Sequence, residues 1–577
     1  MPAVGSELGG YCEDRPAAHA QKKPSVPHLT AGRKQTSRRK SPYLCTPTSA
    51  LLESDCCAPP SRRNTAAVSS PRSAPGQHQP PSTSPATLTF TSTSFLHRLA
   101  ISLKQDLRLE QQKRTMAEQA EIFNDSVHGH IKMHPLLVKI IDTPEFQRLK
   151  NIKQLGAGYF VFPGASHNRF EHSIGVAHLA GELVRSLRAQ GNDITDKDEL
   201  CVQIAGLCHD LGHGPFSHVF EIFMKEAKQE LKWEHEAASV RMFEQLIKNK
   251  KNNKTIEKIM EDDYKFDKND IEFIKELIDS KAVPHSAEDT WPYEGRGRDK
   301  SYLYEIVANK RTGIDVDKMD YFSRDCLHLG MKSNFSHERY VMFARVCTNE
   351  KNEKQICIRD KEALNMYELF HVRYLLHHTA YQHRVKVAIE MMIVDALLAA
   401  EADFMLDGMK ISAVPNEPKK YLKITDDILQ EIKHSEQAKD IIERIEKRDL
   451  YSCVGSKIFQ PEALEDLNTA EQQEPELSEK DFRVRPIKID YGKKEENPID
   501  SLRFYSKDEK DKAVPLSAYE VSYIQPGIFY ETKVMLFYKK KPVPDLSKED
   551  INLFWKMIRK LPEQKHGAPH SKRPRRQ

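Results

Sequence analysis

The stretch GLCHDLGHGPFSH at residues 206–218 combines side chains that bind metals with residues that end a helix. His209 and Asp210 follow an apolar run typical of a helix, and the glycines and proline behind them must break that helix. An imidazole beside a carboxylate can bind a metal ion, and a glycine-rich exit lets a substrate approach the backbone closely. The alternative is a His-Asp pair that only caps its own helix, so the rest of the chain must decide.

Two imidazoles and two carboxylates in helix-like segments form a candidate metal site, namely His172, His209, Asp210 and Asp317. The acids are flanked by apolar residues at helical spacing, so they should point inward, where an unpaired charge is costly. A bound cation removes that cost, and a mixed nitrogen and oxygen set suits Zn, Fe or Mn, with positions left for water or substrate. The chain has 24 histidines, so some would align by chance.

Other polar side chains of the chain suit a phosphate ester, because imidazole titrates near neutral pH, cations complement phosphate, and tyrosine stacks on or hydrogen-bonds a sugar. They are the histidines His213, His218 and His235, the cations Arg169, Lys318, Arg373 and Arg384, and the tyrosines Tyr321 and Tyr381. Taken singly, each is as easily explained as a structural or surface group.

Apolar periodicity predicts that the elements which position these groups are mainly helices. We expect helices over Pro135–Leu149, from about His172, over Glu199–Leu211, between Lys225 and Lys281, over Asp315–Leu329 and over Asn365–Phe404. A short strand and turn should open the folded part near Glu121, and an aromatic strand should follow the glycine break at 156–158, over Tyr159–Phe162.

The segment after about residue 415 differs in kind. Helices are expected at Asp426–His434 and Gln437–Leu450, and β-like runs at Phe482–Asp490, Leu502–Tyr505 and Val534–Tyr538. The fold class is therefore mainly α, with a helical core and a smaller C-terminal α+β lobe. The expected divisions are a disordered, basic, Ser/Pro-rich tail at 1–115, a helical domain at 116–415, the α+β lobe at 416–560 and a basic tail at 561–577.

Composition excludes several classes of protein. With a net charge of +4 over 577 residues, bulk charge does not indicate a nucleic-acid binder. The ten cysteines lack paired spacing, which favours reduced thiols over a disulfide framework. No apolar run reaches membrane-spanning length, and the N-terminus lacks the apolar core of a secretory signal. The basic run Lys572–Arg576 indicates nuclear localisation, with the cytoplasm as the alternative.

Four runs of residues closely resemble the HD phosphohydrolase superfamily and, within it, the animal deoxynucleoside triphosphate triphosphohydrolases that carry a SAM and an HD domain. The runs are Asn168–Ser173, Cys208–His218, Gly313–Tyr321 and Ala380–His383. The resemblance covers about Phe123 to Asp500, and we expect no SAM helix bundle in the first 110 residues. It implies an HD-domain core that hydrolyses dNTPs to deoxynucleoside and inorganic triphosphate, controls dNTP pools and restricts viral DNA synthesis.

The same resemblance implies roles for particular residues. His172, His209, Asp210 and Asp317 would hold the divalent metal, with Mg accompanying the nucleotide. His213 and His235 would be catalytic, His235 as the acid for the leaving group, and Glu221 would stand in for an Asp of the family and orient His213. Substrate contacts would come from Gln154, Leu155, Arg169, His218, Lys318, Tyr321, Asp325, Arg373, His377 and Tyr381. Tyr381 would be the wall that rejects a ribose 2′-hydroxyl.

The resemblance further implies activation by GTP or dGTP at one site and a dNTP at the next, which together join homodimers into homotetramers. The positions assigned to these nucleotide sites are Asn124, Asp142, Gln147, Lys150, Val161, Phe162, Arg339, Arg359, Lys361, Asn365, His383, Arg384, Val385 and Arg448. The departures are Glu121 and Glu496 in place of lysines, Ser452 and Thr379 in place of basic residues, and Lys150 in place of an arginine. Because a Lys-to-Glu change turns attraction to phosphate into repulsion, we expect a competent catalytic site with weakened or altered nucleotide-driven assembly.

Two other functions remain open at this point. An HD phosphohydrolase acting on another nucleotide or a phosphodiester could use the same metal site. A protein that binds single-stranded nucleic acid or serves as a scaffold could use the lysine runs at 248–254 and 539–541 and the basic tail. Such runs are usually solvated faces, and an Asp210→Asn variant that keeps nucleic-acid binding but loses hydrolysis would separate the two.

Overall fold

The computed structural model of the protein describes residues 120–228, 233–280, 290–349, 352–459, 481–524, 526–542 and Trp555. The tail expected at 1–115, the basic tail at 561–577 and the runs of basic residues within them lie outside the described residues. All described residues belong to one unit, Thr89–Gln577. The boundary expected near residue 415 therefore stays a prediction.

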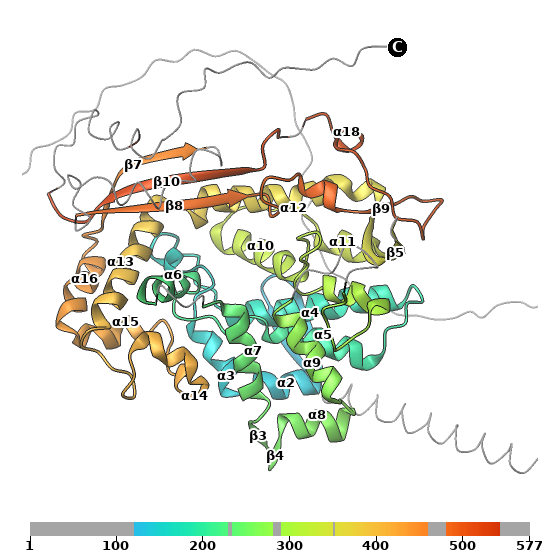
Figure 1. Ribbon diagram of the computed structural model, residues 1–577, viewed down its shortest axis with the longest axis horizontal. Helices are drawn as coiled ribbons and strands as arrows, with labels where there is room; N and C mark the ends of the chain where they lie inside the picture. The colour runs from blue at the N-terminus through green and yellow to red at the C-terminus, as the bar shows by residue number, and fades with distance from the viewer. Residues whose placement is uncertain are drawn as a thin grey trace, which may run out of the picture. The chain divides into compact units, whose positions relative to one another are not determined.

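Helices dominate the described chain, and the sheets are small, as the predicted fold class requires (Figure 1). The helices up to residue 343 are α2 (Pro135–Ile141), α3 (Pro144–Gln147), η1 (Arg148–Asn151), η2 (Gly156–Phe160), α4 (Arg169–Arg188), α5 (Asp196–Cys208), α6 (His218–Ala227), α7 (His235–Leu246), α8 (Ile256–Tyr264), α9 (Lys268–Ile278), η3 (Arg298–Glu305), α10 (Val316–Leu329) and α11 (His337–Phe343). Those that follow are η4 (Asp360–Glu362), α12 (Ala363–Leu376), the π-helical turn η5 (His377–Tyr381), α13 (Arg384–Ala400), η6 (Ile411–Asn416), α14 (Pro418–Tyr421), α15 (Ile428–Glu431), η7 (Ile432–His434), α16 (Glu436–Glu446), η9 (Pro498–Ser501) and α18 (Ala518–Val521).

The strands form four small sheets within the described residues. Two are antiparallel hairpins, β1 (Glu121–Asp125) with β2 (Gly129–Met133), and β3 (Lys250–Lys251) with β4 (Lys254–Thr255). A third has the order β5 (Ala344–Thr348), β6 (Lys354–Arg359), β9 (Phe504–Tyr505), and the fourth has the order β7 (Ser452–Phe459), β10 (Tyr530–Tyr538), β8 (Phe482–Asp490). Because β9 pairs in parallel with β6, the C-terminal strands are attached to the helical part by backbone hydrogen bonds.

Most predicted elements are confirmed, and the differences have local causes. The helix expected over Pro135–Leu149 breaks after Ile141, because Pro144 starts a new helix and disfavours helical backbone at Thr143. The aromatic strand expected over Tyr159–Phe162 is wrong, since Gly156 with its φ of 54° opens the turn of 3₁₀ helix η2 instead. The Asn365–Phe404 run is a pair of helices separated by η5.

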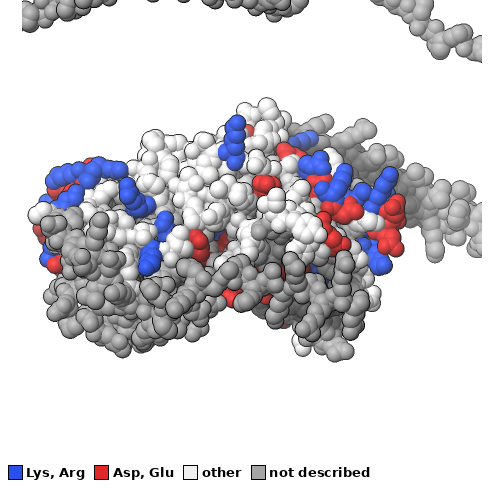
Figure 2. Space-filling model, turned by 90° about the horizontal axis from the view of Figure 1, so that it is seen from above, with Lys and Arg blue, Asp and Glu red and all other residues white. Residues whose placement is uncertain are grey.

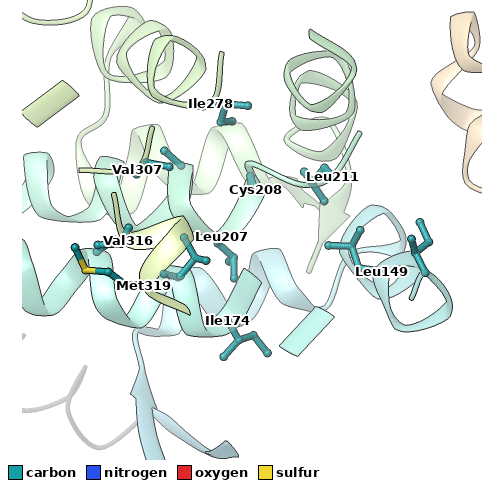
Figure 3. Packing of buried hydrophobic residues seen from close by; sticks show 14 of the residues in the cluster. Leu149, Ile174, Leu207, Cys208, Leu211, Ile278, Val307, Val316 and Met319 are labelled. Carbon is teal, nitrogen blue, oxygen red and sulfur yellow. The ribbon is translucent and has the colours of Figure 1, made fainter. Parts of the chain in front are cut away.

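Residues close in the chain to the predicted metal ligands belong to a buried apolar cluster, part of which is drawn in Figure 3. Ile174 of α4, Leu207 of α5 and Val316 of α10 are at most 3% exposed and belong to one core cluster. α4 packs along α5, and α10 packs on α4. This packing places the helix ends that carry the four predicted ligands next to one another.

Two expectations from composition can be compared with the structure. The described cysteines, which run from Cys201 to Cys453, are all free thiols. Within the part of the chain that the structure describes, no helix is long and apolar enough to cross a membrane.

Candidate active site

The predicted metal ligands come from the ends of three helices. His172 lies in the first turn of α4, His209 and Asp210 follow the last turn of α5, and Asp317 lies in the first turn of α10. α4 begins with a capping box, in which the backbone N–H of Asn168 donates to the Glu171 carboxylate at 2.7 Å.

The four side chains converge on one point. Nε2 of His172 lies 3.4 Å from Oδ2 of Asp210 and 3.1 Å from Oδ1 of Asp317. Nε2 of His209 lies 3.4 Å from Oδ1 of Asp210 and 3.4 Å from Oδ1 of Asp317. His172, His209 and Asp210 each offer an atom that can bind a metal within 4.8 Å of the others. The structure thus brings together ligands that are far apart in the sequence.

The hydrogen bonds behind the two imidazoles direct their Nε2 atoms toward a cation. Nδ1 of His209 lies 2.8 Å from the carbonyl oxygen of Gly206, which can only accept, so Nδ1 carries the proton and Nε2 presents its lone pair. The Nε2 atoms of His172 and His209 are buried and make no hydrogen bond to any described residue. Nitrogen lone pairs that face carboxylate oxygens repel them unless positive charge lies between, so these residues fit a divalent transition metal.

The same carboxylates attract a proton when no metal is bound. Burial lowers the pKa of His172, but the carboxylates of Asp317 and Asp320 outweigh burial and raise its pKa to about 10. Burial raises the pKa of Asp317, yet the two histidines hold it below its usual range. Metal binding must therefore displace a proton from this site.

Asp320 orients His172 from behind, a role that no sequence argument had assigned. Its Oδ2 accepts from Nδ1 of His172 at 2.7 Å, and its Oδ1 accepts from Nε2 of His128 at 2.7 Å and from Nη2 of Arg324 at 2.8 Å. α10 can bring this carboxylate so close to α4 because Gly175 has no side chain, and a Cβ there would lie 1.9 Å from Oδ1 of Asp320. The spacing of Asp317 and Asp320, three residues apart on one helix face, is the signal that could have found it.

A second group of imidazoles lies beside the metal ligands. Nε2 of His213 is 3.3 Å from Oδ1 of Asp210, and the rings of His213 and His235 stack with centroids 4.0 Å apart. Oε1 of Glu221 accepts from Nδ1 of His235 at 2.7 Å and from Nδ1 of His218 at 3.1 Å. The expectation that Glu221 orients His213 is therefore wrong: from α6 its carboxylate reaches His235 at the start of α7, and His213 is reached only through the stacked ring.

The two stacked imidazoles have pKa values shifted in opposite directions. Burial lowers the pKa of His235, but its hydrogen bond to Glu221 outweighs burial and raises that pKa above the usual value. Burial, with the nearby charges of Arg169 and His235, holds the pKa of His213 well below the usual value. One ring thus favours the protonated form and its neighbour the neutral form, which is the pattern of an acid paired with a hydrogen-bond acceptor or base.

Three of the four predicted phosphate-binding cations, Arg169, Lys318 and Arg373, already have an acidic or carbonyl partner. Nη1 of Arg169 donates to Oδ2 of Asp210 at 2.6 Å, and Nζ of Lys318 lies 3.0 Å from Oδ2 of Asp315. Nε of Arg373 donates to the carbonyl oxygen of Asp490 at 3.1 Å. Arg169 lies directly at the metal centre, whereas Lys318 and Arg373 are held at its edge with donors to spare.

The residues predicted to surround the sugar also meet. The hydroxyl of Tyr381 donates to Oδ2 of Asp325 at 2.5 Å, and the ring of His377 lies against that of Tyr381 with centroids 5.1 Å apart. The ring of Tyr321 lies 6.3 Å from that of His172. Asp325 is held from its other side by Nε2 of His167 at 2.6 Å, a contact that the sequence analysis missed.

The remaining predicted substrate residues lie on the loop before α4 and at the rim. The backbone carbonyl of Gln154 accepts from Nη2 of Arg169 at 3.4 Å, and its Oε1 is buried without a partner among the described residues. Leu155 caps η2, and the side chain of His218 is 67% exposed. Gln154 and Leu155 thus lie beside Arg169, and His218 lies above Glu221.

The predicted regulatory positions fall into separate surface groups. Phe162 packs edge to face on His383 with centroids 5.5 Å apart, and Nη1 of Arg448 donates to the carbonyl of Phe160 at 2.8 Å. This contact set also includes Val161, and Arg384 and Val385 directly follow His383 at the start of α13. The structure therefore gathers the predicted positions at 161–162, 383–385 and 448.

A second regulatory group surrounds the ring of Phe343. Nζ of Lys361 lies 3.9 Å from the ring centroid, and Arg339, which pairs with Glu362, lies over the same ring. Asn365 holds Ser336 through its side-chain amide. Arg359 pairs with Asp360 at 2.9 Å at the start of the same turn.

The other predicted regulatory positions lie around α2, η1 and the first hairpin. Asp142 pairs with Lys251 at 3.0 Å, Gln147 donates to the carbonyl of Ile141 at 2.8 Å, and Lys150 lies 4.7 Å from the ring centroid of Phe170. Asn124 pairs with His130 across the β1–β2 hairpin. The departures Glu121, Thr379 and Glu496 are exposed and Ser452 is half-buried, so the structure constrains their side chains little.

Five lysines of the runs considered for nucleic-acid binding pair with acids. Lys251 pairs with Asp142 and Lys254 with Asp262 at 3.3 Å. Lys539, Lys540 and Lys541 pair with Asp395, Asp481 and Asp449. On the face drawn in Figure 2, acidic and basic side chains are likewise intermixed at its right-hand end. Paired lysines are weak phosphate ligands, so these contacts do not favour the nucleic-acid alternative.

Comparisons with known proteins agree with this geometry. The HD domain family matches residues 169–325, a range that contains all four predicted metal ligands. The chain is 46% identical over 492 residues to the deoxynucleoside triphosphate triphosphohydrolase SAMHD1 of Gallus gallus, covering 80% of this chain and 79% of that protein. It is 46% identical over 446 residues to SAMHD1 of Homo sapiens, covering 73% and 70%, and 36% identical over 440 residues to the SAMHD1 homolog of Dictyostelium discoideum, covering 73% and 78%.

Proposed function

The chain belongs to the SAMHD1 family of deoxynucleoside triphosphate triphosphohydrolases and is a hydrolase that acts on dNTPs, and from this premise we propose how its residues perform the reaction. Water adds to the α-phosphorus, the bond between that phosphorus and the 5′-oxygen breaks, and the products are deoxynucleoside and inorganic triphosphate. The observation that carries the proposal is the convergence of His172, His209, Asp210 and Asp317 beside an imidazole pair with opposite pKa shifts.

His172, His209, Asp210 and Asp317 would hold one divalent transition metal, which when bound supplies Lewis-acid polarisation of the phosphoryl group and a lowered pKa for bound water. The protein prepares this site in advance. Asp320 and the Gly206 carbonyl fix the two imidazoles, and Arg169 fixes Asp210.

His235 is the proposed proton donor for the leaving 5′-oxygen. Its hydrogen bond to Glu221 raises the pKa of His235 and so favours the protonated form, and it leaves Nε2 as the atom that can face the substrate. His213 stacks on it and stays neutral, so it can accept a hydrogen bond without repelling the protonated ring. The proton lost by His235 is returned from solvent after product release.

Lys318 and Arg373 are the proposed electrostatic partners of the triphosphate at the edge of the site. Burial lowers the pKa of Lys318, but Asp315 outweighs burial and raises it to about 12, so the ammonium stays charged. The hydroxyl of Tyr381 is held by Asp325 and cannot swing away, and a fixed ring is the proposed wall against a ribose 2′-hydroxyl.

Regulation by GTP and dNTPs, with assembly of dimers into tetramers, is proposed in altered form. It is supported by the surface grouping of Phe162, His383 and Arg448 and by the cations around Phe343. Acidic Glu121 and Glu496 should weaken phosphate binding there. A role in limiting dNTP pools and viral DNA synthesis, and action in the nucleus, are extensions of the same proposal; the basic run at 572–576 supports the last.

The deciding experiment incubates the full chain, loaded with Mn or Fe, with each dNTP, with and without GTP, and separates the products by ion-exchange chromatography. Equimolar deoxynucleoside and inorganic triphosphate are expected. Release of pyrophosphate and deoxynucleoside monophosphate would instead indicate another phosphohydrolase, and hydrolysis of GTP at the rate of dGTP would contradict the role of Tyr381.

A further inference from the structure

The loop that carries His213 is held from outside the HD domain. This catalytic loop, residues 211–217, lies against the segment 421–426, which follows the HD match by about a hundred residues. The hydroxyl of Tyr421 donates to the carbonyl of Gly212 at 2.9 Å, and Oδ1 of Asp426 accepts from the backbone N–H of Phe216 at 2.6 Å. The segment thus binds the catalytic loop at both of its ends.

Arg148 ties the two segments together at a third place. Its Nη1 donates to the carbonyl of Leu211 at 3.3 Å and its Nε donates to the carbonyl of Ile424 at 3.0 Å. The guanidinium also lies over the ring of Tyr421, 4.3 Å from the centroid. A buried arginine that satisfies one carbonyl from each segment fixes their separation.

The catalytic loop needs such support, because its backbone is strained. Phe216 and Ser217 have φ values of 56° and 58°, in a region that residues with a side chain rarely adopt. Ordinarily glycine would occupy such positions. Strained conformations persist only where surrounding contacts hold them, and Asp426 is bonded to the first of the two strained residues.

A chain of hydrogen bonds links these strained residues to the metal ligand Asp210. Oγ of Ser217 donates to the carbonyl of Lys153 at 2.7 Å and accepts from Nε of Arg169 at 3.0 Å, and Nη1 of Arg169 donates to Asp210 at 2.6 Å. Oδ2 of Asp426 accepts from the backbone N–H of Lys153 at 2.9 Å. The carboxylate of Asp426 therefore holds the catalytic loop and the Lys153 loop together, and Ser217 and Arg169 lie where these two loops meet.

We propose that Asp426 is a positioning residue for dNTP hydrolysis: its two carboxylate oxygens fix the catalytic loop and the Lys153 loop relative to each other, and so set the placement of Arg169, His213 and Asp210. The inference rests on the function proposed above and adds a residue that the HD match does not contain. The alternative is that Asp426 only stabilises the fold. The positioning role and the purely structural role differ in their effect on kcat.

The test compares Asp426→Asn with Asp427→Asn in the full, metal-loaded chain. The Asn amide keeps the size of the carboxylate but presents N–H atoms to one of the two backbone donors, so one of the two bonds is lost. Asp426, Phe216 and Lys153 line a cavity of about 200 Å³, so the side chain has room to relax. Asp427 lines the same cavity, is exposed and bonds to neither loop, which makes it the matched control.

For Asp426→Asn we expect kcat to fall about 10- to 100-fold, since a misplacement of about 1 Å costs up to about that much. KM should change by less than about threefold, and the metal content per chain, measured by plasma emission spectrometry, should equal that of wild type. Tyr421→Phe removes only the hydrogen bond to Gly212 and should also lower kcat, by a smaller factor. If Asp426→Asn does not fold, the kcat of Tyr421→Phe tests the proposal instead. Asp427→Asn should match wild type.

Two results would overturn the inference. One is a kcat for Asp426→Asn within about twofold of wild type. The other is a loss of activity in strict proportion to lost metal, which would leave Asp426 a structural brace only. A wild-type chain that releases no triphosphate from any dNTP would instead refute the proposed function, so the two failures are distinguishable.

Discussion

The metal centre and the predicted regulatory surface differ in how tightly their side chains are held. At the metal centre three of the four predicted ligands have a buried partner behind them: Asp320 for His172, the Gly206 carbonyl for His209 and Arg169 for Asp210. At the regulatory positions the decisive side chains Glu121 and Glu496 are exposed. A buried, mutually bonded group constrains all its neighbours, whereas an exposed cation can be exchanged for an acid at little cost to the fold.

This contrast leads to separate expectations for the two regions. Catalysis should depend steeply on single buried residues, because removing one leaves its partners unpaired. Assembly should depend on the sum of exposed charges and respond in smaller, graded steps. The following variants test that difference, from the largest expected effect to the smallest.

Asp210→Asn should reduce dNTP hydrolysis by on the order of 10³-fold or more, because it removes an anionic metal ligand and leaves Arg169 without its carboxylate partner. The rate is measured as triphosphate release, and metal content by plasma emission spectrometry on the same sample. Asp407→Asn, which alters an exposed acid paired with Lys423, is the control for the loss of a carboxylate. A variant that keeps both its metal and its rate would remove Asp210 from the centre.

Glu221→Gln should move the pH dependence of kcat, with a modest loss of rate at neutral pH. Protonated His235 is the proposed acid, so kcat falls as pH rises through its pKa, and Glu221 raises that pKa above the usual value for histidine. Without the carboxylate this limb should shift to lower pH, and the loss of rate should therefore grow between pH 7 and pH 8.5. The profile is measured at saturating dATP, and an unchanged limb would mean that His235 is not the group that titrates.

The double variant with Glu121→Lys and Glu496→Lys tests the predicted regulatory surface and should strengthen nucleotide-driven assembly. Each change replaces a repelled acid with a phosphate-binding cation, so the nucleotide concentration that drives assembly should fall by about tenfold. Sedimentation velocity with GTP and dATP measures it, with kcat of the assembled species as the control that should stay constant. Wild-type chains that already form tight tetramers at micromolar nucleotide would contradict the expectation of weakened assembly.

Much of the helical part was predictable because it depends on local pattern. The helix that begins near His172 and the helix Asp315–Leu329 are confirmed almost to the residue as α4 and α10, since both are long, strongly periodic and capped. The predicted strand at Tyr159–Phe162 was wrong because a short aromatic run is compatible with either state, and the tight turn at Gly156 decided it. Strands β5, β6 and β7 went unnoticed: β5 and β6 are short runs that pair with each other, and β7 pairs with the distant strand β10.

The candidate site divides in the same way. The metal ligands could be named from residue types and their family resemblance, because each sits within a recognisable run. The partner of Glu221 could not, because it depends on where α6 and α7 meet, and the expected contact with His213 proved to be a contact with His235 and His218. Asp426 was missed for the same reason, since nothing in an isolated aspartate says which distant backbone it will face, whereas Asp320 had a local signal in its spacing from Asp317.

The sequence by itself determined which chemical groups are present and which helices carry them, because side-chain identity and amphipathic periodicity are properties of neighbouring residues. The tertiary structure alone decided their relative placement: the convergence of α4, α5 and α10 at one cation site, the stacking of His213 on His235, and the approach of Asp426 to the strained catalytic loop. These are contacts between residues remote in the chain, and they follow from how the buried apolar faces pack rather than from any local preference.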